Sequence, residues 1–102
     1  MKTIAFDATI ATNVENAVME FFGCERHDIV KFKDSEVKKV VVFILFHHFG
    51  FNKRIIGWNY RITHWYVPTA ADEVKALCDV DNEFSRKVFG VLDSVKPLIH
   101  AM

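Results

Sequence analysis

The most apolar segment of the chain, VVVFILF at Val40–Phe46, has no polar face and must be buried on every side. Its β-branched residues favour a strand locally. The longer stretch from Ser35 to Phe49, followed by Gly50 as a stop, favours a helix, with Asp34 or Ser35 as its N-cap. Periodicity alone leaves these two alternatives open, and the run is too short to span a bilayer.

The segment before it has the pattern of an amphipathic helix from Thr12 to Phe22. Thr12 and Glu15 have the spacing of a capping box, and Gly23 is placed to end the helix. The next residues, CERHDIV, are expected to form a second short turn, followed by a connection over residues 28–33.

Two more helices are expected at positions marked by caps. Asn52 is placed to cap a helix over residues 53–60, with a turn at 61–63. Asp81 or Asn82 is placed to cap a last helix, which has an apolar stripe and Pro97 near its end.

Between them, a helix is expected to begin near Thr63 or His64 and to run to about Cys78. Pro68 conflicts with that start, because a proline is tolerated only in the first turn of a helix. The helix therefore begins late, near Val67, or its first turn is irregular.

A rival fold has to be weighed against this all-α architecture. Residues 57–67, GWNYRITHWYV, also alternate in the manner of a strand. Such a strand would pair with Val40–Phe46 as a central hairpin in an α+β domain. Propensity alone makes the two folds nearly equal alternatives.

Length and composition predict one domain over residues 1–102. Half of the residues are hydrophobic (51%) and ten are phenylalanine, which is enough for a core. The net charge is zero, yet residues 35–66 have five basic residues against one acidic residue. Because the local field matters more than the total charge when a protein meets a polyanion, this segment keeps nucleic acid among the candidate partners.

Several functional classes lack their signatures. No phosphate-binding loop, nucleophile elbow or zinc-protease motif occurs, and Cys24 and Cys78 form no metal-binding pair. The adjacent His47 and His48 cannot share one metal from a single helix face. We therefore expect no enzyme, no cofactor and no bound metal. With no signal-peptide pattern and no membrane span, a cytoplasmic protein with reduced thiols is expected.

The order of these segments resembles the C-terminal DNA-binding domain of the DnaA family of bacterial replication initiators. TNVENAVMEFFGCERHDI is similar to its opening helix, and SEVKKVVVFILFHHFG to its long central helix. FNKRIIGWNY is similar to the first helix of its helix-turn-helix, and RITHWYVPTAADEVKAL to its recognition helix.

This resemblance covers residues 12–78 and implies an all-α domain with a helix-turn-helix core, as also found in the Trp repressor. Residues 79–102 resemble the extra C-terminal helix of short stand-alone relatives from phages and mobile elements. The implied function is binding of double-stranded DNA through a recognition helix near residues 63–77, linked to replication or its regulation.

The resemblance also suggests roles for individual residues. Thr63, His64 and Tyr66 are expected to make hydrogen bonds to bases or phosphates. Trp65 is expected either to contact DNA or to lie in the core, and the core is the preferred location for both Trp65 and Trp58. Four basic residues are expected to bind phosphates, namely Lys38, Lys53, Arg54 and Arg61.

At the recognition helix the sequence departs from the family signature Arg-Asp-His-Ser-Thr-Val. His64 and Val67 match it, whereas Ile62, Thr63 and the pair Trp65-Tyr66 do not. Recognition of the family's usual origin sequence is therefore not expected.

The alternative function is a protein-interaction module built on a degenerate helix-turn-helix, which binds a protein partner or self-associates. Its expected surface is an apolar patch formed by Trp65, Tyr66, Phe49 and Phe51, if these side chains are exposed together. Salt dependence separates the two functions, because phosphate contacts weaken steeply with salt and apolar contacts do not.

Overall fold

A computed structural model describes residues 6–31 and 35–100, and every regular element in these ranges is helical. The expected all-α class is confirmed. The elements are α1 (Ala8–Phe22), α2 (Arg26–Val30), α3 (Glu36–Phe43), a π-helical turn η1 (Ile44–His48), α4 (Lys53–Tyr60), α5 (Tyr66–Val80) and α6 (Asn82–His100).

The apolar run at Val40–Phe46 is helical, in α3 and η1. The Ser35 hydroxyl caps α3 by accepting a hydrogen bond from the Lys38 N–H at 3.2 Å. Asp34, the other expected cap, lies outside the described residues. At the far end the Phe49 N–H donates to the Ile44 carbonyl at 3.2 Å, an i to i−5 bond that continues the helix as a π turn.

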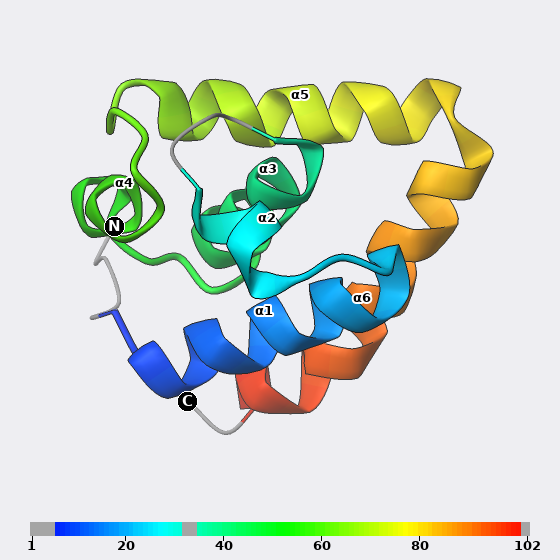
Figure 1. The fold of residues 1–102 in the computed structure, drawn as a ribbon, viewed down its shortest axis with the longest axis horizontal. Coiled ribbons are helices and arrows are strands. Elements are labelled where there is room, and N and C mark those ends of the chain that lie inside the picture. The colour runs from blue at the N-terminus through cyan, green and yellow to red at the C-terminus, as the bar shows by residue number, and fades with distance from the viewer. Residues whose placement is uncertain (1–5, 32–34, 101–102) are drawn as a thin grey trace.

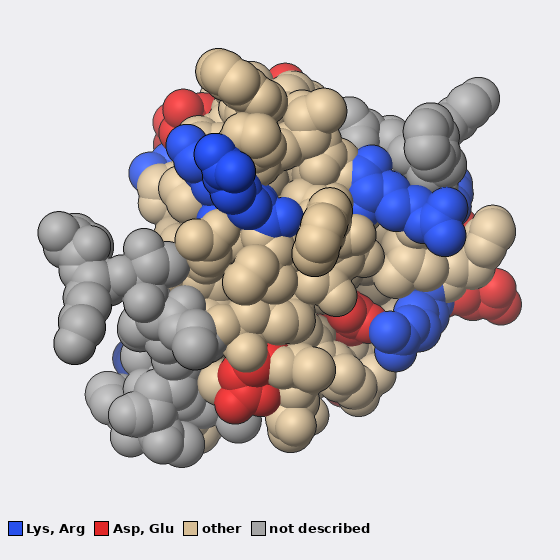
Figure 2. Space-filling view, turned by 90° about the vertical axis from the view of Figure 1, so that its left-hand side faces the viewer, with Lys and Arg blue, Asp and Glu red and all other residues tan. Residues whose placement is uncertain are grey.

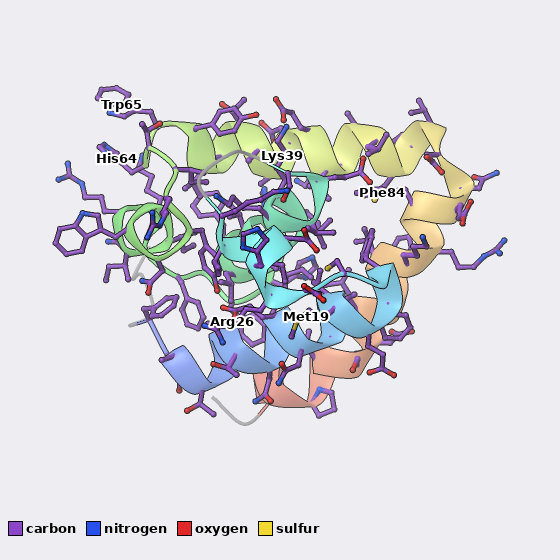
Figure 3. All side chains as sticks on the ribbon, viewed as in Figure 1. Met19, Arg26, Lys39, His64, Trp65 and Phe84 are labelled. Carbon is purple, nitrogen blue, oxygen red and sulfur yellow. The ribbon has the colours of Figure 1, made fainter. Side chains whose placement is uncertain are left out.

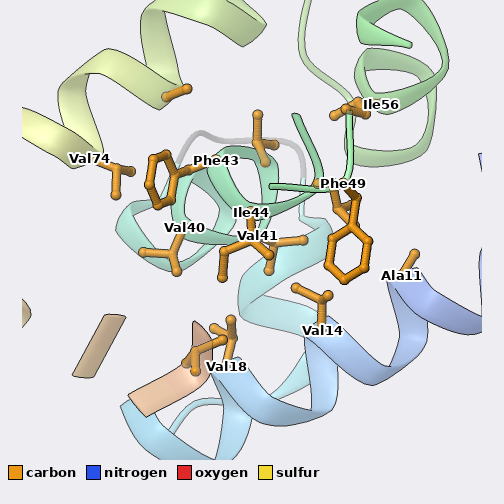
Figure 4. Packing of buried hydrophobic residues seen from close by; sticks show 14 of the residues in the cluster. Ala11, Val14, Val18, Val40, Val41, Phe43, Ile44, Phe49, Ile56 and Val74 are labelled. Atoms are coloured by element: carbon orange, nitrogen blue, oxygen red, sulfur yellow. The ribbon is translucent and has the colours of Figure 1, made fainter. Parts of the chain in front are cut away.

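The helix wins over the strand because other helices surround this segment. α3 contacts α1, α2, α4 and α5. Figure 4 shows Val14 and Val18 of α1 on one side of Val41 and Ile44, with Val74 of α5 on the other side of α3. The rival hairpin is wrong, since residues 57–67 belong to the end of α4, a connection and the start of α5.

Figure 1 shows how the other helices are placed around α3. α5 runs along one side of the molecule, and α1 and α6 pack against each other on the opposite side. α4 lies at one end, seen almost along its axis while α5 lies across the view. The connection from α4 to α5 therefore turns sharply at a corner of the molecule.

α1 begins earlier than the sequence predicted. The Asp7 carboxylate accepts hydrogen bonds from the N–H groups of Thr9 at 2.9 Å and Ile10 at 3.2 Å, which makes Asp7 the N-cap. The Thr12 capping box is wrong, because Thr12 lies inside the helix and its hydroxyl donates to the Ala8 carbonyl at 2.9 Å. Gly23 ends the helix with φ 65°, as expected.

The Pro68 conflict is resolved by a late start of α5. The helix begins at Tyr66, so Pro68 lies in its first turn, where a missing N–H costs no intrahelical bond. Asn52 caps α4 by accepting from the Arg54 N–H at 2.8 Å, as expected. Asp81 accepts from the Phe84 N–H at 3.0 Å at the start of α6, and that helix continues through Pro97.

Candidate functional site

Except for Lys38, the expected site residues gather where α4 meets α5. We call this region the α4–α5 corner and define it as residues 53–69, which include α4, the connection 61–65 and the first turn of α5. Lys53, Arg54 and Arg61 are all exposed here. Figure 3 shows His64 and Trp65 projecting outward from the same corner.

Backbone geometry folds the connection back against α4. Arg61 ends α4 in the left-handed region with φ 59°, and the Ile62 N–H donates to the Gly57 carbonyl at 3.0 Å. A Cβ on Gly57 would lie 2.5 Å from the Ile62 carbonyl oxygen and 3.2 Å from the His64 nitrogen. The close approach of the connection to α4 therefore requires glycine at position 57.

The N-terminus of α5 offers few free donors to an anion. The N–H of Tyr66 donates to the Thr63 carbonyl at 3.0 Å, and that of Val67 donates to the His64 carbonyl at 3.3 Å. Pro68 has no N–H. Any phosphate held at this corner must therefore be bound mainly by side chains.

A buried polar cluster fixes the other face of α4. The Tyr60 hydroxyl donates to the Glu15 carboxylate of α1 at 2.5 Å. The Arg26 guanidinium of α2 lies 3.3 Å from the same carboxylate. Burial is the main cause of a Tyr60 pKa well above its ordinary value, and the hydrogen bond to Glu15 raises this pKa further. The hydroxyl therefore stays protonated. This cluster ties α4 to α1 and α2 and leaves the opposite face of α4 to solvent.

Both tryptophans lie on that solvent side, so the expectation that they belong to the core is wrong. Trp58 is 89% exposed and Trp65 is 78% exposed. Trp58 projects outward because the opposite face of α4 is buried through Ile56, Gly57 and Tyr60. The Trp65 indole lies beside the His64 imidazole, with ring centroids 5.3 Å apart.

The two indoles line one open groove of about 530 Å³. Its walls combine apolar, aromatic and basic side chains, and none of them is acidic; they are Arg54, Ile55, Trp58, Ile62, Thr63, His64 and Trp65. We call this the tryptophan groove.

The groove includes three residues that the sequence reasoning did not assign to a site, namely Ile55, Trp58 and Ile62. Helical spacing was the available signal, because Trp58 follows Arg54 by four residues and precedes Arg61 by three. An indole on the same stripe as two arginines is placed on the solvent side.

Basic side chains are spread over this end of the molecule. In Figure 2, which looks onto the α4 end, basic side chains lie at two places on the upper half of the face and at one place lower down, with uncharged surface between them. Acidic side chains are visible lower on the face and at its edges. The sequence has no aspartate or glutamate from residue 37 to residue 71. The local field at the corner is therefore positive although the net charge is zero.

Lys38 does not belong to this face, and its expected contact with a DNA phosphate is wrong. Its side chain is fully buried, and its ammonium donates to the Lys31 carbonyl. Neighbouring helices enclose this part of α3, so the Lys38 ammonium cannot reach a ligand in solvent.

Tyr66 is held by a partner from its own helix. Its hydroxyl donates to the Glu73 carboxylate at 2.8 Å, and the Lys39 ammonium of α3 lies 2.7 Å from that carboxylate. The hydrogen bond to Glu73 is the main cause of a raised Lys39 pKa, and the bond from Lys39 is the main cause of a lowered Glu73 pKa. This charged cluster joins α3 to α5 and occupies the Tyr66 hydroxyl.

Beyond its first turn, α5 exposes more acidic than basic side chains. Asp72, Glu73 and Asp79 are exposed, against one exposed basic residue, Lys75. A polyanion lying along the full length of α5 would meet these carboxylates. The part of α5 past its first turn is therefore less favourable for contact with a polyanion than its start.

The apolar patch expected for a protein-interaction module is wrong in its composition. Phe49 and Phe51 are buried, and their rings stack with centroids 5.6 Å apart. At the α4–α5 corner the most exposed aromatic side chains are Trp65, which belongs to the expected patch, and Trp58, which does not.

Within residues 6–31 and 35–97, no group of three or more side chains is placed to hold a metal ion. None of the described helices has the length and apolar character needed to cross a membrane.

No family model, curated protein or solved structure matches this chain. The fold and the corner together define an all-α domain with an exposed basic and aromatic corner. The resemblance to the DnaA C-terminal domain stays a prediction.

Proposed function

We propose that this chain binds DNA through the α4–α5 corner, as a helix-turn-helix module of the kind the DnaA resemblance implies. α4 is the first helix of the pair, residues 61–65 are the turn, and the first turn of α5 approaches the duplex. The observation that carries the proposal is the exposure of Lys53, Arg54 and Arg61 at one corner where no acidic residue is present in the sequence.

In this arrangement the three basic side chains bind phosphates and position the domain. Thr63 is exposed and His64 is partly exposed next to them, within reach of phosphates or base edges. The Tyr66 hydroxyl donates its hydrogen bond to Glu73. Tyr66 therefore contributes to DNA contact through its ring.

The test compares two double variants in a titration of a labelled mixed-sequence duplex. Arg54→Gln with Arg61→Asn removes two charges at the corner, and asparagine tolerates the left-handed backbone at position 61. Arg86→Gln with Lys96→Gln removes two exposed charges from α6 as the control.

We expect the corner variant to bind more weakly at low salt, with the slope of log affinity against log salt reduced by about two. The control should keep both the affinity and the slope of the wild type. Equal losses in the two variants would show that the attraction is not located at the corner.

A second function is favoured by one observation, the large exposure of Trp58 and Trp65 around an apolar groove. Exposed tryptophans of this kind are enriched among the residues that dominate protein interfaces. In that case the ligand is a protein segment, and its binding changes little with salt.

A further inference from the structure

The tryptophan groove offers two exposed aromatic rings, which contacts to phosphates do not use. We propose that it binds unpaired bases, so that DNA with single-stranded segments is bound more tightly than a fully paired duplex. This inference rests on the proposed function, because the same basic residues hold the backbone of the strand.

The first argument is the shape and placement of the two indoles. Trp58 comes from α4 and Trp65 from the connection that follows, yet both line one groove. Their exposures of 89% and 78% leave most of each ring open to a ligand. A paired base in a duplex shows only its edge in a groove, whereas an unpaired base presents its flat face to stack on an aromatic ring.

The second argument is charge complementarity. Arg54 lines the groove itself, and Lys53 and Arg61 are exposed at the same corner. The groove has no acidic lining residue. Aromatic platforms combined with a basic track are the arrangement that single-strand-binding proteins use, because each base arrives with its own phosphate.

The third argument comes from what opposes a longer duplex contact. The surface of α5 past its first turn has exposed Asp72, Glu73 and Asp79. Lys38, the basic residue expected on the central helix, is buried. A strand that lies across the corner, over the groove, avoids the acidic part of α5.

The chain supplies its own reporter for this test. It has two tryptophans, and both line the groove, so its intrinsic indole fluorescence reports on this site alone. We would titrate the whole chain at low salt with an oligothymidine strand and, separately, with a mixed-sequence duplex of equal length. Stacking of bases on the indoles is expected to quench the emission with the strand and to quench it less with the duplex.

Variants locate the contact. Trp58→Ala and Trp65→Ala are each expected to weaken binding of the strand about tenfold, by loss of one stacking platform, and to change duplex binding by less than about twofold. Trp58→Phe should restore most of the loss, because it keeps an aromatic face. Phe89→Ala, which removes an exposed ring from α6, is the matched control and should leave both affinities unchanged.

The outcomes separate this inference from the proposed function. Salt-sensitive duplex binding with no quenching by the strand would overturn the inference and leave the proposed function in place. No binding of either DNA at low salt would overturn both. Quenching by an apolar peptide that persists at high salt, without any by DNA, would also overturn both and assign the groove to a protein partner.

Discussion

Single residues with buried polar groups set the position of α4. Glu15 is 4% exposed, and one of its carboxylate oxygens accepts a hydrogen bond from Tyr60 while the other faces Arg26. A buried carboxylate without such partners would be costly, so the three residues depend on one another. Because they come from α1, α2 and α4, this cluster fixes the helix that bears half of the tryptophan groove.

Tyr60→Phe tests this cluster. The variant removes the hydroxyl that donates to Glu15 and is expected to lower the free energy of unfolding by about 1–3 kcal/mol at neutral pH. Urea unfolding followed by circular dichroism gives the value. A loss near zero would show that Glu15 does not need the hydroxyl.

The pH dependence of stability, compared between the wild type and Tyr60→Phe, is a further test. The pKa of Tyr60 is raised above its ordinary value of 10.0, so the folded state favours the protonated phenol. Its contribution is fully present below pH 10.0 and is lost as the pH rises above that value. The stability difference between wild type and Tyr60→Phe should therefore be constant up to about pH 10 and shrink above it. A difference that grows with pH would contradict this sign.

Lys38 supplies a second prediction at this scale. Lys38→Met keeps an unbranched stem of similar length and removes the ammonium that donates to the Lys31 carbonyl. Because the side chain is fully buried, we expect DNA affinity within about twofold of wild type. Fluorescence anisotropy on the folded variant measures this. A loss as large as that of the Arg54→Gln, Arg61→Asn double variant would place Lys38 at the interface after all.

Whole elements are set by their ends and by the turns between them. Caps and glycines were readable in the sequence at Asn52, Asp81 and Gly23, and the structure has helix ends at each. The Thr12 cap was misassigned because α1 begins five residues earlier in the sequence, where the Asp7 carboxylate accepts from the N–H groups of Thr9 and Ile10. A capping pattern does not reveal which of two neighbouring candidates the chain uses.

The corrected start of α1 can be measured. Asp7→Ala removes the side chain that accepts from two N–H groups and is expected to cost about 1 kcal/mol of stability. Thr12→Ala changes an exposed mid-helix position and should cost less than about 0.5 kcal/mol. If urea unfolding gives the reverse order, α1 begins at Thr12.

The turn at the corner depends on Gly57. Gly57→Ala places a methyl group against the Ile62 carbonyl, and the resulting shift of the connection is expected to cost about 1–3 kcal/mol. Because Trp65 lies on that connection, its emission should also change. Gly90→Ala is the control, since the three atoms nearest to its added methyl group belong to the exposed side chain of Phe21 and not to backbone, so a smaller loss of stability is expected.

At the scale of the whole molecule, propensity left the all-α and α+β folds nearly equal, and the family resemblance favoured the helical class that the structure has. The sequence patterns predicted most of the helix order but not which side chains face solvent. The apolar run at Val40–Phe46 has no polar face. The sequence therefore does not show whether Lys38, on the same helix, faces the core or solvent. Trp58 and Trp65 are large aromatic residues of the kind expected in a core. They are exposed because α4 packs against the core through its other face, which includes Tyr60. The groove depends on contacts between residues far apart in the chain.

The net charge of the whole chain is zero, although the charge of its middle third is positive. The acidic residues of the first and last thirds cancel the basic middle, yet the fold brings Lys53, Arg54 and Arg61 to one corner. A ligand meets the field of that corner and not the sum over the molecule. DNA binding is therefore compatible with a neutral chain.

The measurement that tests the central claim most directly is the anisotropy of a labelled mixed-sequence duplex titrated with the wild-type chain, first at low salt and then at higher salt. The α4–α5 corner predicts binding at low salt that weakens steeply as salt increases, because each phosphate contact releases counterions. No binding at low salt, or binding that salt does not change, would contradict the claim that this corner is a DNA-binding face.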